Sequence, residues 1–118
     1  MPCSKGASSV RAAVLAVAVS AATTGIASAQ DAALVKKGQE VYAAQKCSIC
    51  HSIAGQGSKA NPLDGVGAKP ADELRAWIAD PVAMTKKTQS KKKPAMPKNA
   101  KLSAGDIDAL VAYMQSLK

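Results

Sequence analysis

Aromatic residues are scarce in this chain of 118 residues, which has one Trp, two Tyr and no Phe. Few side chains are therefore available on which nucleic-acid bases could stack, and the composition argues against a nucleic-acid-binding surface. A single domain of this size buries a modest share of its surface and usually needs extra stabilisation. We therefore expect a large apolar group other than aromatic side chains to complete the core.

Cysteine and histidine are also few, with three Cys and one His. Cys3 lies near the N-terminus, whereas Cys47 and Cys50 lie next to the sole histidine, His51. A disulfide between Cys47 and Cys50 would close a very small loop and stabilise little. A structural zinc site would need a second pair of ligands, which the chain does not offer.

Long apolar runs are missing as well. The apolar run at residues 12–22 is well short of the about 20 residues that cross a membrane as a helix. Basic residues precede this run, and Ala27-Ser28-Ala29 follows it, which predicts a cleavable signal peptide over residues 1–29 rather than a retained anchor. We therefore expect a periplasmic protein whose mature part, residues 30–118, is one domain and not an integral membrane protein.

The expected mature chain, residues 30–118, carries a net positive charge. Lys5 and Arg11 lie in the predicted signal, so 14 basic and eight acidic residues remain, a formal charge of +6. Such an excess suits nucleic acid, an anionic membrane or an acidic protein. Export argues against nucleic acid, and we predict an acidic protein surface as the partner.

Three segments have the apolar periodicity of helices, namely about Asp31–Cys47, Pro70–Ala79 and Ser103–Leu117. Ser103 and Asp106 resemble a capping box, and Pro81 is expected to stop the second helix. No stretch alternates with period two, so we predict an all-α fold. The expected apolar stripe of the first helix consists of Leu34, Val35, Gly38, Val41 and Tyr42.

The most specific motif is Cys47-Ser48-Ile49-Cys50-His51. On a helical turn, residues three and four apart share a face, so two thiols and an imidazole can approach one flat ring from the same side. This spacing is the c-type haem attachment signature, in which both cysteines form thioethers and the histidine binds iron. A thiol–disulfide site would lie beside a βαβ pattern, which is absent from the sequence.

The second axial ligand cannot be a histidine, because His51 is the only one. Met, Lys, water or an open position remain, and the mature chain offers Met84, Met96 and Met114. Met114 falls in an apolar helical stripe, and Met84 follows Pro81 closely. Met96 is flanked by prolines that favour an extended backbone, so we predict that it presents its sulfur to the iron. His/Met ligation raises the reduction potential.

Lysines gather in the expected loop from Thr85 to Leu102, which contains Met96. We predict a docking patch for an acidic redox partner, such as a terminal oxidase or a quinol-oxidising complex. The alternative is a solvated linker with no partner. The predicted patch consists of Lys86, Lys87, Lys91, Lys92, Lys93 and Lys98.

These residues together resemble the class I cytochromes c over nearly all of the mature chain. The resemblance implies that Gly38 and Tyr42 of the first helix meet the last helix near Tyr113. It also implies that the proline carbonyl of Asn61-Pro62-Leu63 accepts the ring N–H of the ligand histidine. Trp77 stands where the family often has a Tyr beside the methionine. The implied fold has three main helices and loops around one covalently bound haem.

We therefore expect an electron carrier rather than an enzyme. One alternative is the haem subunit of a larger oxidoreductase. Another is an enzyme or sensor with an open iron, which would follow if Met96 is not a ligand. A third, a haem-free zinc or thiol module, would carry no covalent haem.

Overall fold

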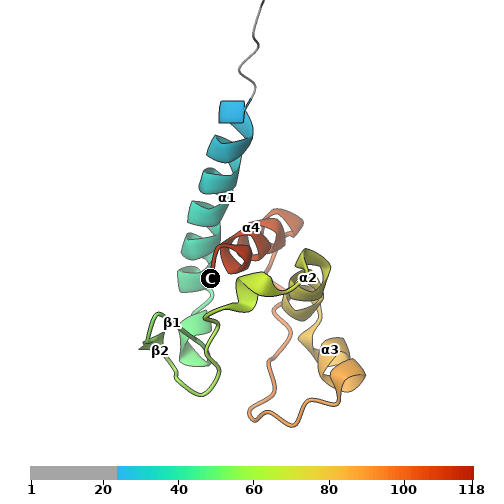
Figure 1. The fold of residues 1–118 in the computed structure, drawn as a ribbon. Helices are drawn as coiled ribbons and strands as arrows, with labels where there is room; N and C mark the ends of the chain where they lie inside the picture. The colour runs from blue at the N-terminus through green and yellow to red at the C-terminus, as the bar shows by residue number, and fades with distance from the viewer. Residues whose placement is uncertain (1–23) are drawn as a thin grey trace, which may run out of the picture.

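The computed structural model describes residues 24–118 and is mostly helical (Figure 1). Its elements are the helices α1 (Thr24–Ala44), α2 (Ala71–Ala79), α3 (Pro81–Thr88) and α4 (Ala104–Gln115), the 3-10 turns η1 (Cys47–Ile49) and η2 (Val66–Ala68), and the strands β1 (Ser52–Ile53) and β2 (Gln56–Gly57). The two short strands form a single antiparallel pair, and the other elements are helices or 3-10 turns. The predicted all-α class is therefore confirmed. The predicted signal peptide lies outside the described residues as far as residue 23, and residues 24–29 belong to α1.

The core lies where α4 crosses α1 (Figure 1). Four residues of α4 are buried, and Leu74 joins them from α2. The predicted stripe of α1 is only partly buried, because Leu34 is 38% exposed. The buried residues of α4 are Ala109, Leu110, Val111 and Met114.

The first helix ends earlier than predicted. Lys46 adopts left-handed backbone angles (φ 55°, ψ 37°), which no α-helix can continue. The chain therefore turns between Ala44 and Cys47, and the attachment motif occupies a separate 3-10 turn. The prediction that one helix reaches Cys47 is wrong.

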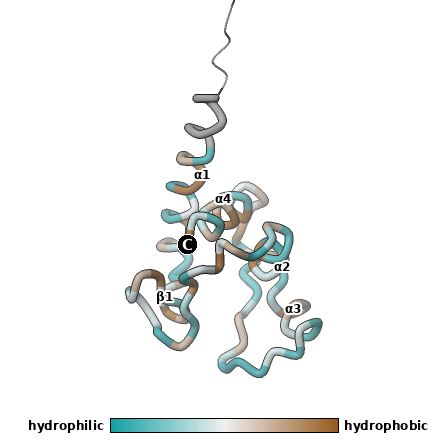
Figure 2. Tube along the Cα trace, viewed as in Figure 1, coloured by the Kyte–Doolittle hydropathy of each residue, from teal (hydrophilic) through white to brown (hydrophobic). Residues whose placement is uncertain are grey.

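A fourth helix, α3, was not predicted. Pro81 ends α2 and at the same time begins α3, because a proline fits the first helical position. The Asp80 carboxylate caps this helix by accepting a hydrogen bond from the backbone N–H of Ala83 at 3.1 Å. The expected loop from residue 85 is therefore shorter, and residues 89–102 form it. Figure 2 shows that its first part is hydrophilic.

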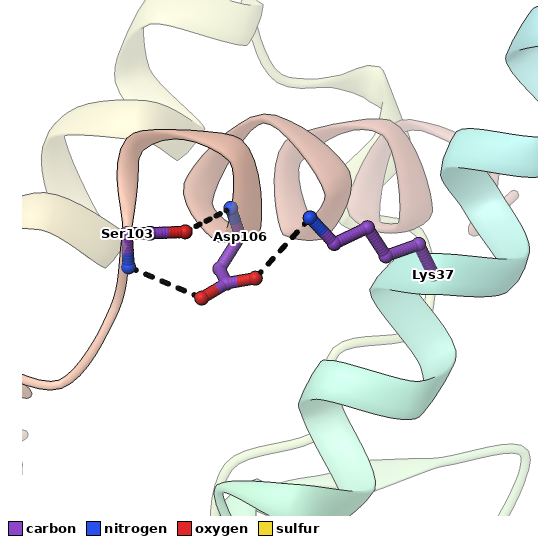
Figure 3. A network of polar contacts seen from close by, with 3 residues as sticks. All are labelled: Lys37, Ser103 and Asp106. Carbon is purple, nitrogen blue, oxygen red and sulfur yellow. Dashed lines mark hydrogen bonds and ion pairs between the residues drawn. The ribbon is translucent and has the colours of Figure 1, made fainter.

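The capping box of α4 is confirmed and has an additional partner (Figure 3). The Ser103 hydroxyl accepts from the Asp106 N–H, and the Asp106 carboxylate accepts from the Ser103 N–H, both at 3.1 Å. Lys37 of α1 reaches the same carboxylate at 3.3 Å. The N-terminus of α4 is thereby tied to α1.

No helix in the described part of the chain has the length and apolarity needed to cross a membrane.

Candidate functional site

One cavity of about 680 Å³ brings the predicted site residues together. The η1 turn and the segment after it form one side, the loop 89–102 forms another, and α2 and α4 contribute apolar walls. Cofactor pockets commonly have volumes of about 300–1,000 Å³, so this cavity has the size of a cofactor site. Its lining includes all six residues predicted for the site, namely Cys47, Cys50, His51, Pro62, Trp77 and Met96.

The attachment motif forms a tight turn that places both thiols at the cavity. The N–H groups of Cys50 and His51 donate to the carbonyl of Cys47 at 3.2 and 3.0 Å. Cys47 and Cys50 are half-buried and form no disulfide. The side chain of Ile49, between them in sequence, is 69% exposed. The turn thus directs the two thiols inward and the intervening apolar side chain outward.

The environment of Cys47 does not suit a reactive thiolate. Burial raises the pKa of this thiol above its ordinary value, and the neighbouring Cys50 adds to the effect. Catalytic and redox cysteines generally have a lowered pKa, because the thiolate is the nucleophile. The site therefore favours thiols that serve as attachment points over a thiol–disulfide centre.

The His51 ring is oriented by a backbone carbonyl. Its Nδ1 lies 3.1 Å from the carbonyl oxygen of Asn61, so Nδ1 carries the proton and donates it. Nε2 is then left with a lone pair that can bind a metal. The expectation that the carbonyl of Pro62 accepts this hydrogen bond is wrong, because the residue before the proline supplies it. A bridge between Ser52 and Pro62 holds the two segments side by side.

The structure separates the three methionines. Met96 is half-buried in the loop 89–102 and lines the cavity. Met114 lines it from α4 as part of the buried core, with 6% of its surface exposed. Met84 is buried against a different hollow, between α2 and α3, and does not line the cavity. Met84 and Met96 are the two methionines outside α4. Of these two, only Met96 is placed to reach a group bound in the cavity.

Sequence reasoning missed a side-chain contact at the edge of the cavity. The amide of Asn99 donates to the side-chain oxygen of Gln45 at 2.7 Å, joining the end of α1 to the loop that bears Met96. Both residues line the cavity. The partners are 54 positions apart, and no local pattern in the sequence predicts such a contact.

The residues present fit a covalently bound haem. Two inward thiols, an imidazole with a free Nε2 and a thioether are the donor set that a c-type haem uses. Apolar side chains of α2 and α4 supply the walls that a porphyrin ring requires, among them Leu74, Trp77 and Leu110.

Comparison with known proteins agrees with this fit. The Cytochrome c family matches residues 35–118. Cytochrome c oxidase subunit 2 of Alkalihalophilus pseudofirmus is 30% identical over 72% of this chain and 26% of its own length. The cbb3-type cytochrome c oxidase subunit CcoP of an Azospirillum species is 33% identical over 75% of this chain and 30% of its own length. The chain thus spans less than a third of these relatives, and no solved structure gives a significant match.

The family match covers the attachment turn, the cavity walls and the methionine loop together. A domain of this kind transfers electrons through a covalently bound haem. The chain therefore belongs to the cytochrome c family, and its cofactor is haem c with its iron.

Proposed function

We propose that this chain is a periplasmic carrier of single electrons and not an enzyme. Cys47 and Cys50 hold the haem through thioether bonds, and His51 and Met96 bind its iron. The observation that carries the proposal is the cavity, because it collects these four residues from two segments far apart in the sequence. The bound haem supplies an iron that alternates between the ferric and ferrous states.

The protein's own contribution is to fix the ligands and to limit access of water. The carbonyl of Asn61 fixes the tautomer and the orientation of the His51 ring. Leu74 and Leu110 are buried walls of the cavity. With His51 and Met96 both holding the iron, no coordination site would remain for a substrate, which is why we propose transfer of electrons without catalysis.

Carbon monoxide tests whether the iron is closed. The dithionite-reduced protein should show no rapid new carbon monoxide band, because His51 and Met96 would leave no open coordination site on the iron. Rapid binding would reveal an open iron and would favour an enzyme or a sensor.

The lysines after residue 85 form the proposed docking patch, which consists of Lys86, Lys87, Lys91, Lys92, Lys93 and Lys98. All six side chains are exposed, and Lys92 lies at the cavity, so a partner bound there would come close to the haem. Lys98 also pairs with Asp80 at 3.6 Å, which makes it less available than the others. We propose that the patch binds an acidic surface of a terminal oxidase or a quinol-oxidising complex.

The periplasmic location rests on residues 1–29, which have the composition of a cleavable signal peptide. Cleavage after Ala29 would leave Gln30 as the first residue. Sequencing the N-terminus of the exported protein tests this assignment, and a protein that retains residue 1 would contradict it.

A second candidate is a haem domain that stays bound to an oxidase. Both relatives described above are oxidase subunits by name, which favours this alternative. Fractionation of native membranes in high salt separates the two candidates. A carrier held by lysines should be released as salt rises, whereas a subunit should remain with the oxidase.

A further inference from the structure

The loop that bears Met96 has few attachments to the rest of the molecule. Residues 93–98 take part in no backbone hydrogen bond within the described part of the chain. Side chains therefore decide where this loop lies. Two neighbouring residues, Lys98 and Asn99, anchor it to different elements.

The two anchors differ in strength. Lys98 pairs with Asp80 at 3.6 Å, and both side chains are about half exposed, so this ion pair contributes little. The hydrogen bond from Asn99 to Gln45 is 2.7 Å long, and both residues are half-buried at the cavity. A partly buried hydrogen bond of this kind resists competition from water better than an exposed ion pair does.

Each partner of this hydrogen bond is itself held in place. The N–H of Gln45 donates to the carbonyl of Val41 at 2.9 Å, which continues the last turn of α1. The side-chain oxygen of Asn99 accepts from the N–H of Lys101 at 3.0 Å and closes a turn after the methionine. Gln45 precedes Cys47 by two positions, and Asn99 follows Met96 by three.

We propose that Gln45 and Asn99 form a clasp that positions Met96 over the cavity and keeps its sulfur on the haem iron. This inference rests on the proposed ligation by Met96. The clasp joins the segment that carries the attachment cysteines to the segment that carries the distal ligand. Loss of the clasp frees the loop and lets an added ligand displace the methionine.

Imidazole binding to the ferric, haem-loaded protein measures this release. One hydrogen bond of this kind is worth a factor of about three to ten in an equilibrium constant. Gln45→Ala and Asn99→Ala should therefore each bind imidazole about three- to tenfold more tightly than wild type. Because the two residues act as one contact and Asn99 also caps the turn at Lys101, the double variant should bind imidazole no more tightly than Asn99→Ala alone. Lys98→Ala is the control and should stay within about twofold of wild type.

Acidic substitutions distinguish the clasp from a general loss of packing. In Asn99→Asp, the amide of Gln45 can turn and donate to the new carboxylate, so this variant should bind imidazole like wild type. In Gln45→Glu, the new carboxylate still accepts from Asn99, with the same result. The double acidic variant has no donor and brings two negative charges together, so it should bind imidazole more tightly than either.

The near-red band of the sulfur–iron bond shows which hypothesis has failed. Absence of this band from the wild type would refute methionine ligation and the clasp with it. Unchanged imidazole affinity in alanine variants that keep the band would refute the clasp alone. Additive effects in the double alanine variant would also overturn the proposal.

Discussion

At the scale of single residues, Gly38 decides how closely α1 and α4 approach. A Cβ atom at this position would lie 2.6 Å from the Cβ of Tyr113 and would also collide with the carbonyl of Ala109. Tyr42 and Tyr113 meet edge to face beside this contact, with ring centres 5.8 Å apart. The absence of a side chain at Gly38 therefore permits the helix crossing that forms the core.

Replacing Gly38 with alanine should destabilise the protein. The clash involves backbone, which cannot move away cheaply, and overpacking of this kind costs about 1–3 kcal/mol. Gly105→Ala is a matched control in α4, because its new Cβ would meet only side-chain atoms, the end of the flexible Lys37 at 3.4 Å and the Ser103 hydroxyl at 3.9 Å. That variant should gain up to about 1 kcal/mol from helix propensity. Denaturant unfolding of both haem-loaded variants tests the contrast, and a Gly38→Ala protein as stable as Gly105→Ala would contradict it.

Methionine substitutions should separate ligation from packing. Met96→Ala should lose the near-red charge-transfer band of the ferric protein, because its sulfur is the proposed ligand. Met84→Ala should keep the band and lose about 2–5 kcal/mol of stability, because Met84 is a buried side chain, 8% exposed, away from the cavity. The ferric spectra and unfolding curves of both variants measure this. Survival of the band in Met96→Ala would show that another group binds the iron.

At the scale of elements, the start of α4 combines a helix cap with a link to α1. The hydrogen bonds from Ser103 lower the pKa of Asp106 below its ordinary value, and Lys37 adds to the effect. A carboxyl group with a lowered pKa in the folded protein stabilises it at a pH above its unfolded pKa. That stabilisation is lost as the pH falls through the folded pKa.

The stability difference between wild type and Asp106→Asn should therefore depend on pH in one direction. It should be constant from pH 7 to about pH 5 and should shrink below about pH 4, where the unfolded carboxyl group binds its proton. Asp80 also has a lowered pKa, but it is present in both proteins and cancels in the comparison. Urea unfolding across this pH range measures the difference. A difference that grows in acid would contradict the assignment.

The elements also show what local sequence signals can predict. The cap at Ser103 and the limits of α2 follow from residues within one turn of each other, so α4 and α2 were predicted closely. The helix α3 was missed because Pro81 was interpreted only as a stop signal, although Asp80-Pro81 also begins a helix. The early end of α1 depends on the left-handed Lys46, which the sequence does not mark with a glycine.

The candidate site divides in the same way. The spacing of Cys47, Cys50 and His51 is local, so a single turn sets how these three side chains lie. The proline-flanked Met96 lines the same cavity, and its binding to the iron stays a prediction. Which carbonyl meets His51 depends on the register between two loops, and this register selects Asn61 instead of Pro62. The contact between Gln45 and Asn99 depends on the whole fold, because it brings together residues that are 54 positions apart in the chain.

At the scale of the whole molecule, the distribution of charge bears on how the proposed carrier would meet a redox partner. Lysines gather on α3 and on the loop after it, beside the cavity that takes the haem. A positive surface in this place would steer an acidic partner toward the proposed redox centre, and salt would screen the attraction.

Charge reversal tests this arrangement. The variant with Lys91, Lys92 and Lys93 all changed to Glu should be reduced more slowly by its native partner than wild type. The wild-type rate should fall as ionic strength rises. Stopped-flow reduction at several salt concentrations measures both effects. Rates that respond to neither the substitutions nor salt would remove the basis for the docking patch.

The covalent haem is the claim on which the whole account depends, and intact mass under denaturing conditions tests it most directly. After expression with cytochrome c maturation machinery, the protein should retain the added mass of one haem. Replacing Cys47 and Cys50 with alanine should remove that mass. A correctly matured wild-type protein that is colourless and has the mass of the polypeptide alone would contradict the account.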